Sequence, residues 1–407
     1  MNEAFVLKKK VNFFKILSLL MLLVLVGQLT QTINIPIIVN ISHFYHISPT
    51  SVQSMATAFL LPYGFFQFIW GPLSDYIGRK RVILLGLLFF IAGIVISLVA
   101  YRFEILLIGS FFQGLGIAVA GVMARTIMFD CYEGEDLMRA NSFVCMCIIL
   151  GPLLAPLIGG FLGYHFGWRS VFLFLGVFSI FVLVMQVLFF VETKDKSETD
   201  FTFYAAISSF MIVFRCTKFK FNLVHVMISM SAISVLETNL GVILGSVLKF
   251  NSILTSLIFI IPVPAFLLGS LLVSKYSSKI SSEFFMLMGI LITFFAAILT
   301  LVFGLGEYIT VFSILLPSII IFFGAGIIFP VATTNALENL SSIAGTAGSI
   351  FGGAQSIGAA ICVGVASCFH ISNQLPLGII LCILLLFSTI LLIVESNVYN
   401  KVLLNDY

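Results

Sequence analysis

The sequence has few charged residues: Asp, Glu, Lys and Arg together make up 9% of its 407 residues, whereas hydrophobic residues make up 60%. A soluble globular domain is usually about 25% charged. A chain with so few charges cannot cover a water-facing surface, which excludes a soluble enzyme and a disordered scaffold. The formal net charge of +3 is too small for a nucleic-acid-binding protein, so we expect no nucleic-acid partner.

Sequence motifs for several other kinds of chemistry are also missing. The seven cysteines form no Cys-x-x-Cys pair, so we expect neither a metal site nor a disulfide framework. No Gly-x-x-x-x-Gly-Lys-Ser/Thr pattern is present, which argues against a self-contained ATP pump, and we expect no cofactor. We find no His/Glu or Ser/His grouping within the apolar runs, so an intramembrane enzyme is disfavoured.

Long apolar runs, in contrast, fill most of the chain. A helix needs about 20 apolar residues to cross a bilayer, and backbone groups in hydrocarbon must be hydrogen-bonded internally, which favours helices. The sequence therefore predicts an all-α integral membrane protein with twelve transmembrane helices. Their rough positions are 14–39, 51–72, 82–100, 105–128, 140–163, 170–191, 223–247, 253–274, 284–304, 309–332, 344–369 and 376–396.

The positive charges are distributed unevenly between the predicted loops. With both ends of the chain on one side, 17 Lys and Arg residues fall on that side and only Arg102, Arg169 and Lys249 on the other. Cytoplasmic loops of membrane proteins carry an excess of Lys and Arg. We therefore predict that both termini are cytoplasmic.

A polar stretch interrupts the alternation of apolar runs and short loops. Residues 192–221 form a predicted cytoplasmic linker between an N-terminal six-helix half, 1–191, and a C-terminal six-helix half, 222–407. Within this linker, 201–214 is apolar but too short to span a membrane. It is either a helix at the membrane surface, near anionic headgroups, or part of a solvated linker.

Two short segments recur six predicted helices apart. FQGLGI (112–117) resembles FFGAGI (322–327), and GPLSDYIGRK (71–80) resembles GSLLVSKYSSK (269–279). A parallel duplication of this kind is typical of transporters with a substrate site near the membrane midplane, between the two halves.

The loop between the second and third predicted helices combines glycines with charge. Gly71 and Gly78 allow a tight turn and close helix approach, and Asp75 can lie at a helix N-terminus. Arg79 and Lys80 can pair with carboxylates across the cytoplasmic face, holding that face shut until it opens. The alternative is a basic loop that only sets the topology of the chain.

The fifth predicted helix contains a run of glycines and prolines. Pro152 and Pro156 lie four residues apart, on one face, and should bend the helix. Gly151, Gly159 and Gly160 reduce the side-chain bulk, so that a neighbouring helix can approach closely. Ordinary use of glycine and proline in a membrane helix is the alternative.

Glu237 is the only acidic residue deep within a predicted span, near the middle of the seventh. A charged group there is costly, so an intramembrane carboxyl is by default a functional candidate. Desolvation favours the protonated form, and Glu237 is therefore our candidate for proton coupling. Alternatively, a permanently protonated Glu237 donates a structural hydrogen bond to a substrate or to a neighbouring helix.

The first two predicted helices carry uncharged polar and aromatic residues within their apolar sequence. Amides offer hydrogen bonds without charge, and aromatic rings offer apolar and cation–π contact, which suits varied amphipathic molecules. Helix–helix packing is the alternative for each residue taken singly. The candidates for a substrate cavity are Gln28, Gln31, Thr32, Asn34, Phe59, Tyr63 and Gln67.

These motifs resemble those of the major facilitator superfamily. The loop at 71–80 resembles the family signature Gly-x-x-x-Asp-(Arg/Lys)-x-Gly-Arg-(Arg/Lys), with Tyr76 in place of one charge. The run at 151–160 resembles the antiporter motif Gly-x-x-x-Gly-Pro-x-x-Gly-Gly, with Ala155 in place of a glycine. Ser110 stands where the family often has an arginine, which casts doubt on the usual arginine-assisted proton step. Arg125 either faces the transport pathway as a charge relay or extends to the membrane interface.

The overall pattern is similar to the Bcr/CflA-type branch of drug:proton antiporters within this family. The resemblance implies the major facilitator fold and proton-driven export of small amphipathic compounds across a bacterial inner membrane by alternating access. Protons, amphipathic substrates and the lipid bilayer are the expected partners, and we expect a monomer. The alternatives are a family member that exports an endogenous small metabolite and, less favoured, an intramembrane enzyme or a channel.

Overall fold

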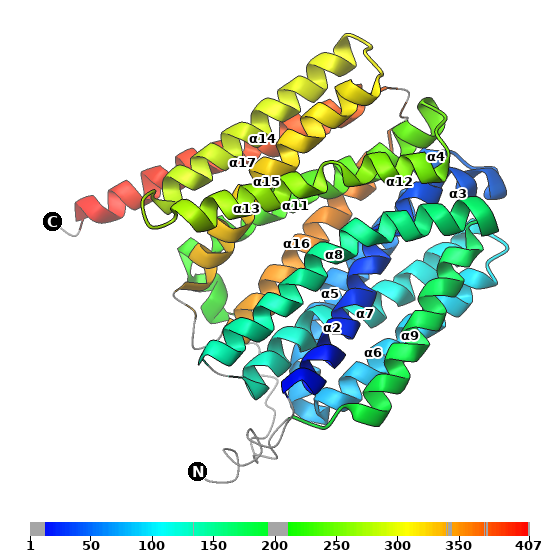
Figure 1. The fold of residues 1–407 in the computed structure, drawn as a ribbon. Coiled ribbons are helices and arrows are strands. Elements are labelled where there is room, and N and C mark those ends of the chain that lie inside the picture. The colour runs from blue at the N-terminus through cyan, green and yellow to red at the C-terminus, as the bar shows by residue number, and fades with distance from the viewer. Residues whose placement is uncertain are drawn as a thin grey trace.

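The computed structural model describes residues 13–132, 134–193, 211–338, 340, 344–369, 371 and 373–405, and this part of the chain is helical with no strand. The helices run roughly alongside one another in two groups, blue to green and green to red in Figure 1. We call these groups the N-terminal half and the C-terminal half.

The N-terminal half contains six passes in the order that the apolar runs predict. The first two passes are each interrupted by a short break. The break in the first pass lies just before Pro36, and the break in the second lies just before Ser54. The passes are α2 (Phe13–Thr32) with η1 (Ile35–Ile37) and α3 (Ile38–Tyr45); α4 (Pro49–Val52) with α5 (Ser54–Ile77); α6 (Arg79–Leu98); α7 (Phe103–Cys131); α8 (Gly134–Phe166); and α9 (Arg169–Phe189).

The C-terminal half contains six further passes. The first ends in a π-helical turn, and the second is broken at Pro262. The passes are α11 (Thr217–Val242) with η2 (Ile243–Val247); α12 (Ser252–Ile260) with α13 (Val263–Tyr276); α14 (Ser282–Leu305); α15 (Val311–Leu337); α16 (Ala344–Ala366); and α17 (Leu375–Asn405).

Eleven of these described passes are long and apolar enough to cross a membrane. The exception is α5, which has 24 residues but includes Gln67, Asp75 and two internal prolines. At 1.5 Å per residue, a helix of that length spans about 36 Å. The protein is a multi-pass membrane protein, and the predicted all-α fold is confirmed.

Helix pairing repeats from one half to the other. In the N-terminal half α5 and α6 pack on α7, α6 packs on α9, and α2 packs on α8. The same pairings recur six passes later, where α13 and α14 pack on α15, α14 packs on α17, and α11 packs on α16. The weak sequence repeats therefore correspond to a repeated architecture.

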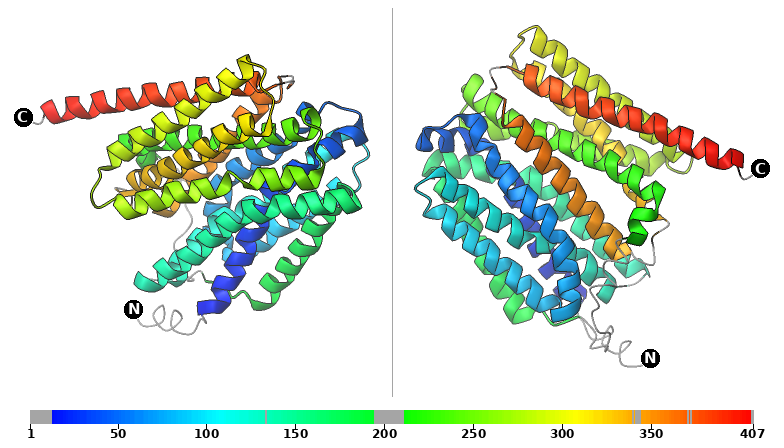
Figure 2. Two further views of the ribbon diagram at one scale, coloured as in Figure 1. Left: turned by 45° about the horizontal axis from the view of Figure 1, so that its top comes forward. Right: turned by 180° about the vertical axis from the view of Figure 1, so that it is seen from behind.

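The halves contact each other mainly through α5 with α16 and through α8 with α12. The right-hand view of Figure 2 shows α16, in orange, running beside the blue α5. Each of these two contacts joins the second pass of one half to the fifth pass of the other, so the interface follows the same pseudo-symmetry as the halves.

The loops between the helices lie at two opposite ends of the molecule, which we call the basic end and the distal end. The basic end contains the loops near residues 78, 132, 190–193 and 277–281. The distal end contains the loops near residues 46–48, 99–102, 167–168, 248–251 and 306–310.

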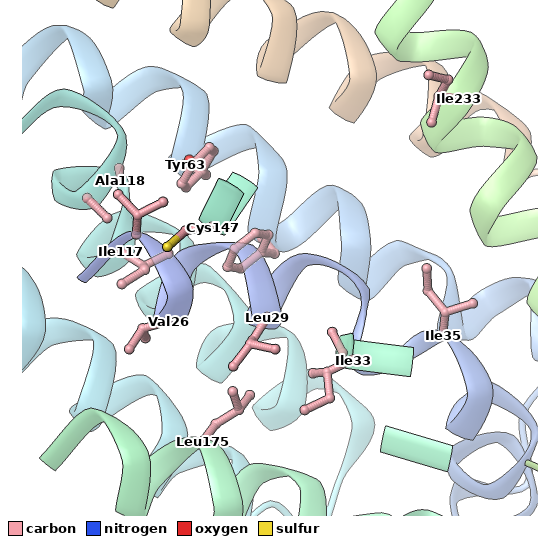
Figure 3. Packing of buried hydrophobic residues seen from close by; sticks show 14 of the residues in the cluster. Val26, Leu29, Ile33, Ile35, Tyr63, Ile117, Ala118, Cys147, Leu175 and Ile233 are labelled. Atoms are coloured by element: carbon pink, nitrogen blue, oxygen red, sulfur yellow. The ribbon is translucent and has the colours of Figure 1, made fainter. Parts of the chain in front are cut away.

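The N-terminal half has α2 at its centre. Leu20, Leu23 and Val26 on this helix and Ile33 directly after it are fully buried, and α2 packs against α7, α8 and α9. Figure 3 shows the cluster around Val26, Leu29 and Ile33. A helix that is apolar all round lies inside a bundle, and this position keeps the polar residues at the end of α2 close to the interface between the halves.

The predicted linker is only partly described. Residues 194–210 lie outside the described residues, and these include most of the 201–214 segment. Residues 211–215 are helical, and Val213 is fully buried in a cluster with Phe219 of α11. The helix α11 begins at Thr217, so its first turn belongs to the stretch predicted as linker.

Candidate functional site

A cavity lies between the two halves, toward the distal end of the bundle. About 780 Å³ of space not filled by atoms lies here, and this volume includes open solvent. Its walls come from the end of α2 with η1 and α3, from α4 and α5, from α7, and from α11 of the C-terminal half. The lining mixes apolar side chains with uncharged polar ones, and Glu237 is the only charged residue among the described residues that line it.

Glu237 lies in the distal half of the helix that runs from Thr217 to Val247. This helix begins earlier than the sequence predicted, so Glu237 is farther from its middle than expected. The side chain is half-buried, lines the cavity, and forms no ion pair or hydrogen bond with another described residue. A carboxyl without a cationic partner in an apolar wall is disfavoured as an ion and can accept a proton.

Four of the seven predicted cavity residues line the cavity together with Glu237: Gln31, Thr32, Asn34 and Phe59. They come from the C-terminal end of α2, the turn that follows it, and the first half of α5. The sequence predicted that they lie on two helices, and the fold brings them together with the Glu237 carboxyl of α11.

The other three predicted residues lie outside the cavity lining. Gln28 packs where α2 meets Gly151 of α8. Tyr63 and Gln67 are buried farther along α5, where the Tyr63 ring stacks on Phe59 with 5.6 Å between centroids. They belong to the interface of α5 with α7 and α16.

Gln53 is a lining residue that the sequence reasoning missed. It lies between α4 and α5, its side chain is buried, and neither its amide nitrogen nor its amide oxygen has a hydrogen-bond partner among the described residues. The same is true of Thr32 Oγ1 and Asn34 Oδ1. Buried polar atoms are normally paired, so this end of the cavity offers free hydrogen-bonding groups to water or to a ligand. An isolated amide before an apolar run was the only signal for Gln53.

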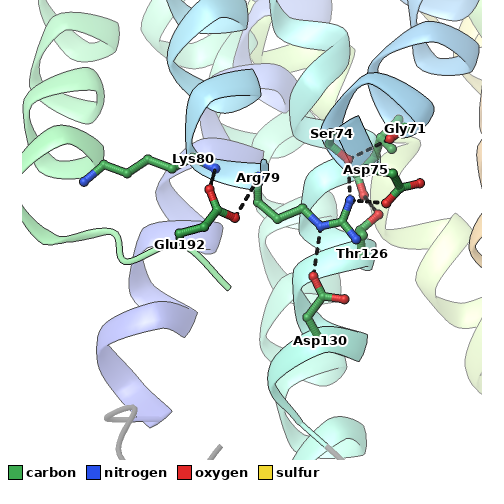
Figure 4. Close-up of polar contacts among 9 residues, drawn as sticks. Gly71, Ser74, Asp75, Arg79, Lys80, Thr126, Asp130 and Glu192 are labelled. Atoms are coloured by element: carbon green, nitrogen blue, oxygen red, sulfur yellow. Dashed lines mark hydrogen bonds and ion pairs between the residues drawn. The ribbon is translucent and has the colours of Figure 1, made fainter. Parts of the chain in front are cut away.

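At the basic end, the predicted gating loop forms a network around Arg79 (Figure 4). Its guanidinium donates through Nη1 to Ser74 and to Asp75, and through Nε to Asp130 Oδ2 at 3.0 Å. The Arg79 side chain is 9% exposed and that of Asp130 24% exposed, whereas Asp75 is 56% exposed. The pair with Asp130 is therefore the better shielded, because exposed ion pairs contribute little.

Glu192 completes this network from the end of α9. Its carboxylate accepts from the backbone N–H groups of Arg79, at 2.9 Å, and Lys80, at 3.1 Å, which have no partner within α6. Gly78 precedes them with φ +97°, and a Cβ there would lie 2.6 Å from Glu192 Oε2. The Lys80 ammonium donates to the Val187 carbonyl.

All of these described partners of Arg79 and Lys80 lie in the N-terminal half, on α5, α7, α9 and the segment after α9. In this conformation the network therefore ties four passes of one half together. Arg79 was expected to pair with carboxylates of the cytoplasmic face, and here it contacts Asp75, Asp130 and, through its backbone N–H, Glu192, all of the N-terminal half.

The glycines of the antiporter-like motif lie at two tight helix contacts. An added Cβ on Gly159 would lie 2.0 Å from the Ile33 carbonyl oxygen of α2. One on Gly160 would lie 1.8 Å from Ser256 Oγ and 2.5 Å from the Ser252 carbonyl oxygen of α12. Gly160 therefore permits the contact between the two halves at the distal end. Pro152 and Pro156 lie within the continuous helix α8.

Two polar side chains also join the halves. Arg125 of α7 donates to the Gly348 carbonyl of α16 at 2.8 Å, so it reaches across the interface to the C-terminal half. At the distal end, Asn40 accepts from Ser252 Oγ at 3.1 Å and donates to the Gly163 carbonyl at 3.4 Å. The hydrogen bond between Ser252 and Asn40 joins the two halves at the distal end, beside Gly160.

One expectation about polar groups in the helices was wrong. His225 of α11 lies beside Ser388 and Glu395 of α17, so a Ser/His/Glu grouping does exist. The Glu395 side chain is 14% exposed and lies at the end of its membrane span, Leu375–Glu395, within the helix α17 that continues to Asn405.

Comparisons with known proteins agree with this architecture. A sequence model of the Major Facilitator Superfamily matches residues 20–363. The chain is 34% identical to multidrug resistance protein D of Escherichia coli K12 over 92% of this chain and 93% of that protein. It is 24% identical to a bicyclomycin resistance protein homolog of Haemophilus influenzae, over 84% and 86% of the two chains. A POT family transporter in complex with 5-aminolevulinic acid has the same fold, with a TM-score of 0.74, 15% identity and coverage of 95% of this chain and 96% of that chain.

Proposed function

Because the chain belongs to the major facilitator superfamily, we propose that it is a secondary active transporter that exports small amphipathic drugs or toxic compounds in exchange for protons. A relative that matches it over nearly its whole length is named for multidrug resistance. Its proposed place is the bacterial inner membrane, with both termini cytoplasmic, since the basic end carries most of the Lys and Arg residues. The cavity is built within one chain, which supports a monomeric transporter.

The observation that carries this proposal is the single carboxyl in the cavity between the halves. A wall that mixes apolar side chains with uncharged hydrogen-bonding groups suits molecules that share an amphipathic character more than a fixed shape. Glu237 adds a group that can hold either a proton or the positive charge of a substrate. Competition between the two at one carboxyl couples proton entry to substrate release.

The contacts between the halves support alternating access. The distal end is closed where Gly160 meets α12 and where Asn40 bonds to Ser252. The network around Arg79 holds four passes of the N-terminal half as one body, so that this half can rock against the other. We assign the loop at 71–80 this stiffening role in gating.

Efflux from inverted membrane vesicles tests the proposal. Vesicles that contain the wild-type protein should accumulate a cationic dye when a pH gradient is imposed, and an uncoupler should abolish the accumulation. Glu237→Gln should remove the dependence on the gradient, whereas Glu237→Asp should retain part of it. Glu283→Gln, on the exposed first turn of α14, is the matched control and should behave as wild type. Unchanged proton dependence in Glu237→Gln would refute the assigned role.

A further inference from the structure

The C-terminal half contains a second polar cluster, outside the cavity. His225 of α11 has a fully buried side chain, and its Nδ1 lies 2.8 Å from Ser388 Oγ of α17. Its Nε2 lies 3.4 Å from Oε2 of Glu395, two turns farther along α17. The two ring nitrogens thus face a hydroxyl and a carboxyl, both from the same neighbouring helix.

Apolar side chains surround this cluster. Phe219, Leu223 and Val226 of α11 are buried in a core to which Leu392 of α17 also belongs. A polar group in such surroundings needs a partner, because an unpaired buried charge is costly. The edge of Glu395 that remains exposed is the side from which water can reach the cluster.

Among the described residues, Glu395 is the charged group within 4 Å of His225. Other titratable groups lie on the elements packed against α11. Besides Glu395, α17 carries Cys382, Tyr399 and Lys401, α16 carries Cys362, and α3 carries His43 and Tyr45 at the distal end. Glu338, which follows α15, is held by Lys218 at 2.7 Å. On α11 itself the other titratable groups are Lys218, Lys220 and Glu237, and α12 and α15 contain none.

The protonation state of His225 decides which hydrogen bonds it can form with Ser388 and Glu395. A neutral imidazole has one donor and one acceptor nitrogen, a hydroxyl can act as either, and a carboxylate only accepts. Neutral His225 can therefore satisfy Glu395 only in the tautomer with the proton on Nε2. A protonated His225 donates from both nitrogens at once, and its contact with Glu395 becomes an ion pair.

We propose that His225, Ser388 and Glu395 form a proton-binding site, and that protonation of His225 strengthens the link between α11 and α17. The site is separate from the cavity, and it does not depend on what the protein transports. It lies about 18 Å before Glu237 on α11, at 1.5 Å per residue. The pH at the basic end thereby acts on the packing of the helix that carries the cavity carboxyl.

A double-mutant cycle tests this site in the purified full-length protein. The thermal unfolding midpoints of wild type, His225→Gln, Glu395→Gln and the double variant are compared from about pH 5 to about pH 8. The coupling between the two positions should be stabilising at the acid end and should lose most of its size as the pH rises. A coupling that stays constant over this range, or that is destabilising at the acid end, would overturn the proposal.

Two further measurements separate proton binding from ordinary packing. Ser388→Ala is the matched comparison, because it removes the neutral partner on the same helix and keeps the charged one, so its loss of stability should vary less with pH than that of Glu395→Gln. Nitrogen spectra of 15N-histidine-labelled wild type do not depend on the stability of any variant, and His225→Gln identifies the signal. The His225 signal should move with pH, whereas a signal fixed over the whole range would contradict the proposal.

Discussion

Gly160→Ala should shift the transporter toward a conformation that is open at the distal end. The added Cβ would lie 2.5 Å from the Ser252 carbonyl oxygen, which is backbone and cannot rotate away as Ser256 Oγ can. A carbon–oxygen contact of about 3.3 Å requires α8 and α12 to separate by roughly 0.8 Å. Overpacking of this kind costs about 1–3 kcal/mol. Because only the closed state makes this contact, its population relative to the open state should fall about 5- to 150-fold.

Labelling of a single cysteine measures this shift. In a background without native cysteines, Gln53→Cys places a thiol in the cavity wall, at a position that is 1% exposed in the closed state. A membrane-impermeant maleimide added from the distal side should react with this thiol faster when Gly160→Ala is also present. The increase should approach the change in the open population.

Gly159→Ala is the matched control for this experiment. Its added Cβ would lie 2.0 Å from the Ile33 carbonyl oxygen, so the clash is as severe, but it falls within the N-terminal half. This variant should lose stability without faster labelling. Equal labelling rates in the two variants, or no acceleration in Gly160→Ala, would refute the role of Gly160 at the interface between the halves.

Three further predictions concern the basic end. Gly78→Ala should cost about 1–3 kcal/mol, seen as a lower unfolding midpoint, because a side chain is strained at φ +97°; Gly71→Ala, with its nearest atom 3.5 Å away, should be nearly neutral. Arg79→Gln should cost about 2 kcal/mol by the same measurement, because it leaves a shielded carboxylate of α7 without its charged partner. Lys218 lowers the pKa of the exposed Glu338, so this pair contributes above the ordinary carboxyl pKa and is lost as the pH falls. Glu338→Gln should therefore lower the midpoint slightly at neutral pH and not at acid pH, and a larger effect at acid pH would reverse this assignment.

The sequence predicted what depends on local composition. Apolar length located the helical passes, and the glycines of the fifth run correctly indicated close helix contacts, with α2 and with α12. Gln31, Thr32 and Asn34 were candidates because they offer hydrogen bonds without charge, and all three line the cavity.

What the sequence could not supply is the pairing of residues far apart in the chain. Arg79 and Lys80 were expected to reach carboxylates across the basic face, but which carboxylates lie nearby depends on how α7 and α9 pack beside α6. His225 and Glu395 are separated by most of the C-terminal half, and each looked isolated in its own helix. Their contact follows from the packing of α11 on α17, which no local pattern encodes.

The single carboxyl of the cavity has a consequence for the energetics of the proposed exchange. One carboxyl carries at most one proton, and the other described lining residues carry no charge to move. Exchange of one proton for a neutral molecule therefore transfers one net charge across the membrane, and a potential of 100 mV adds about 2.3 kcal/mol to the driving force. Exchange for a monovalent cation is electrically silent and depends on the pH difference alone. The same binding wall thus makes the protein an electrogenic transporter for one kind of cargo and an electroneutral one for another.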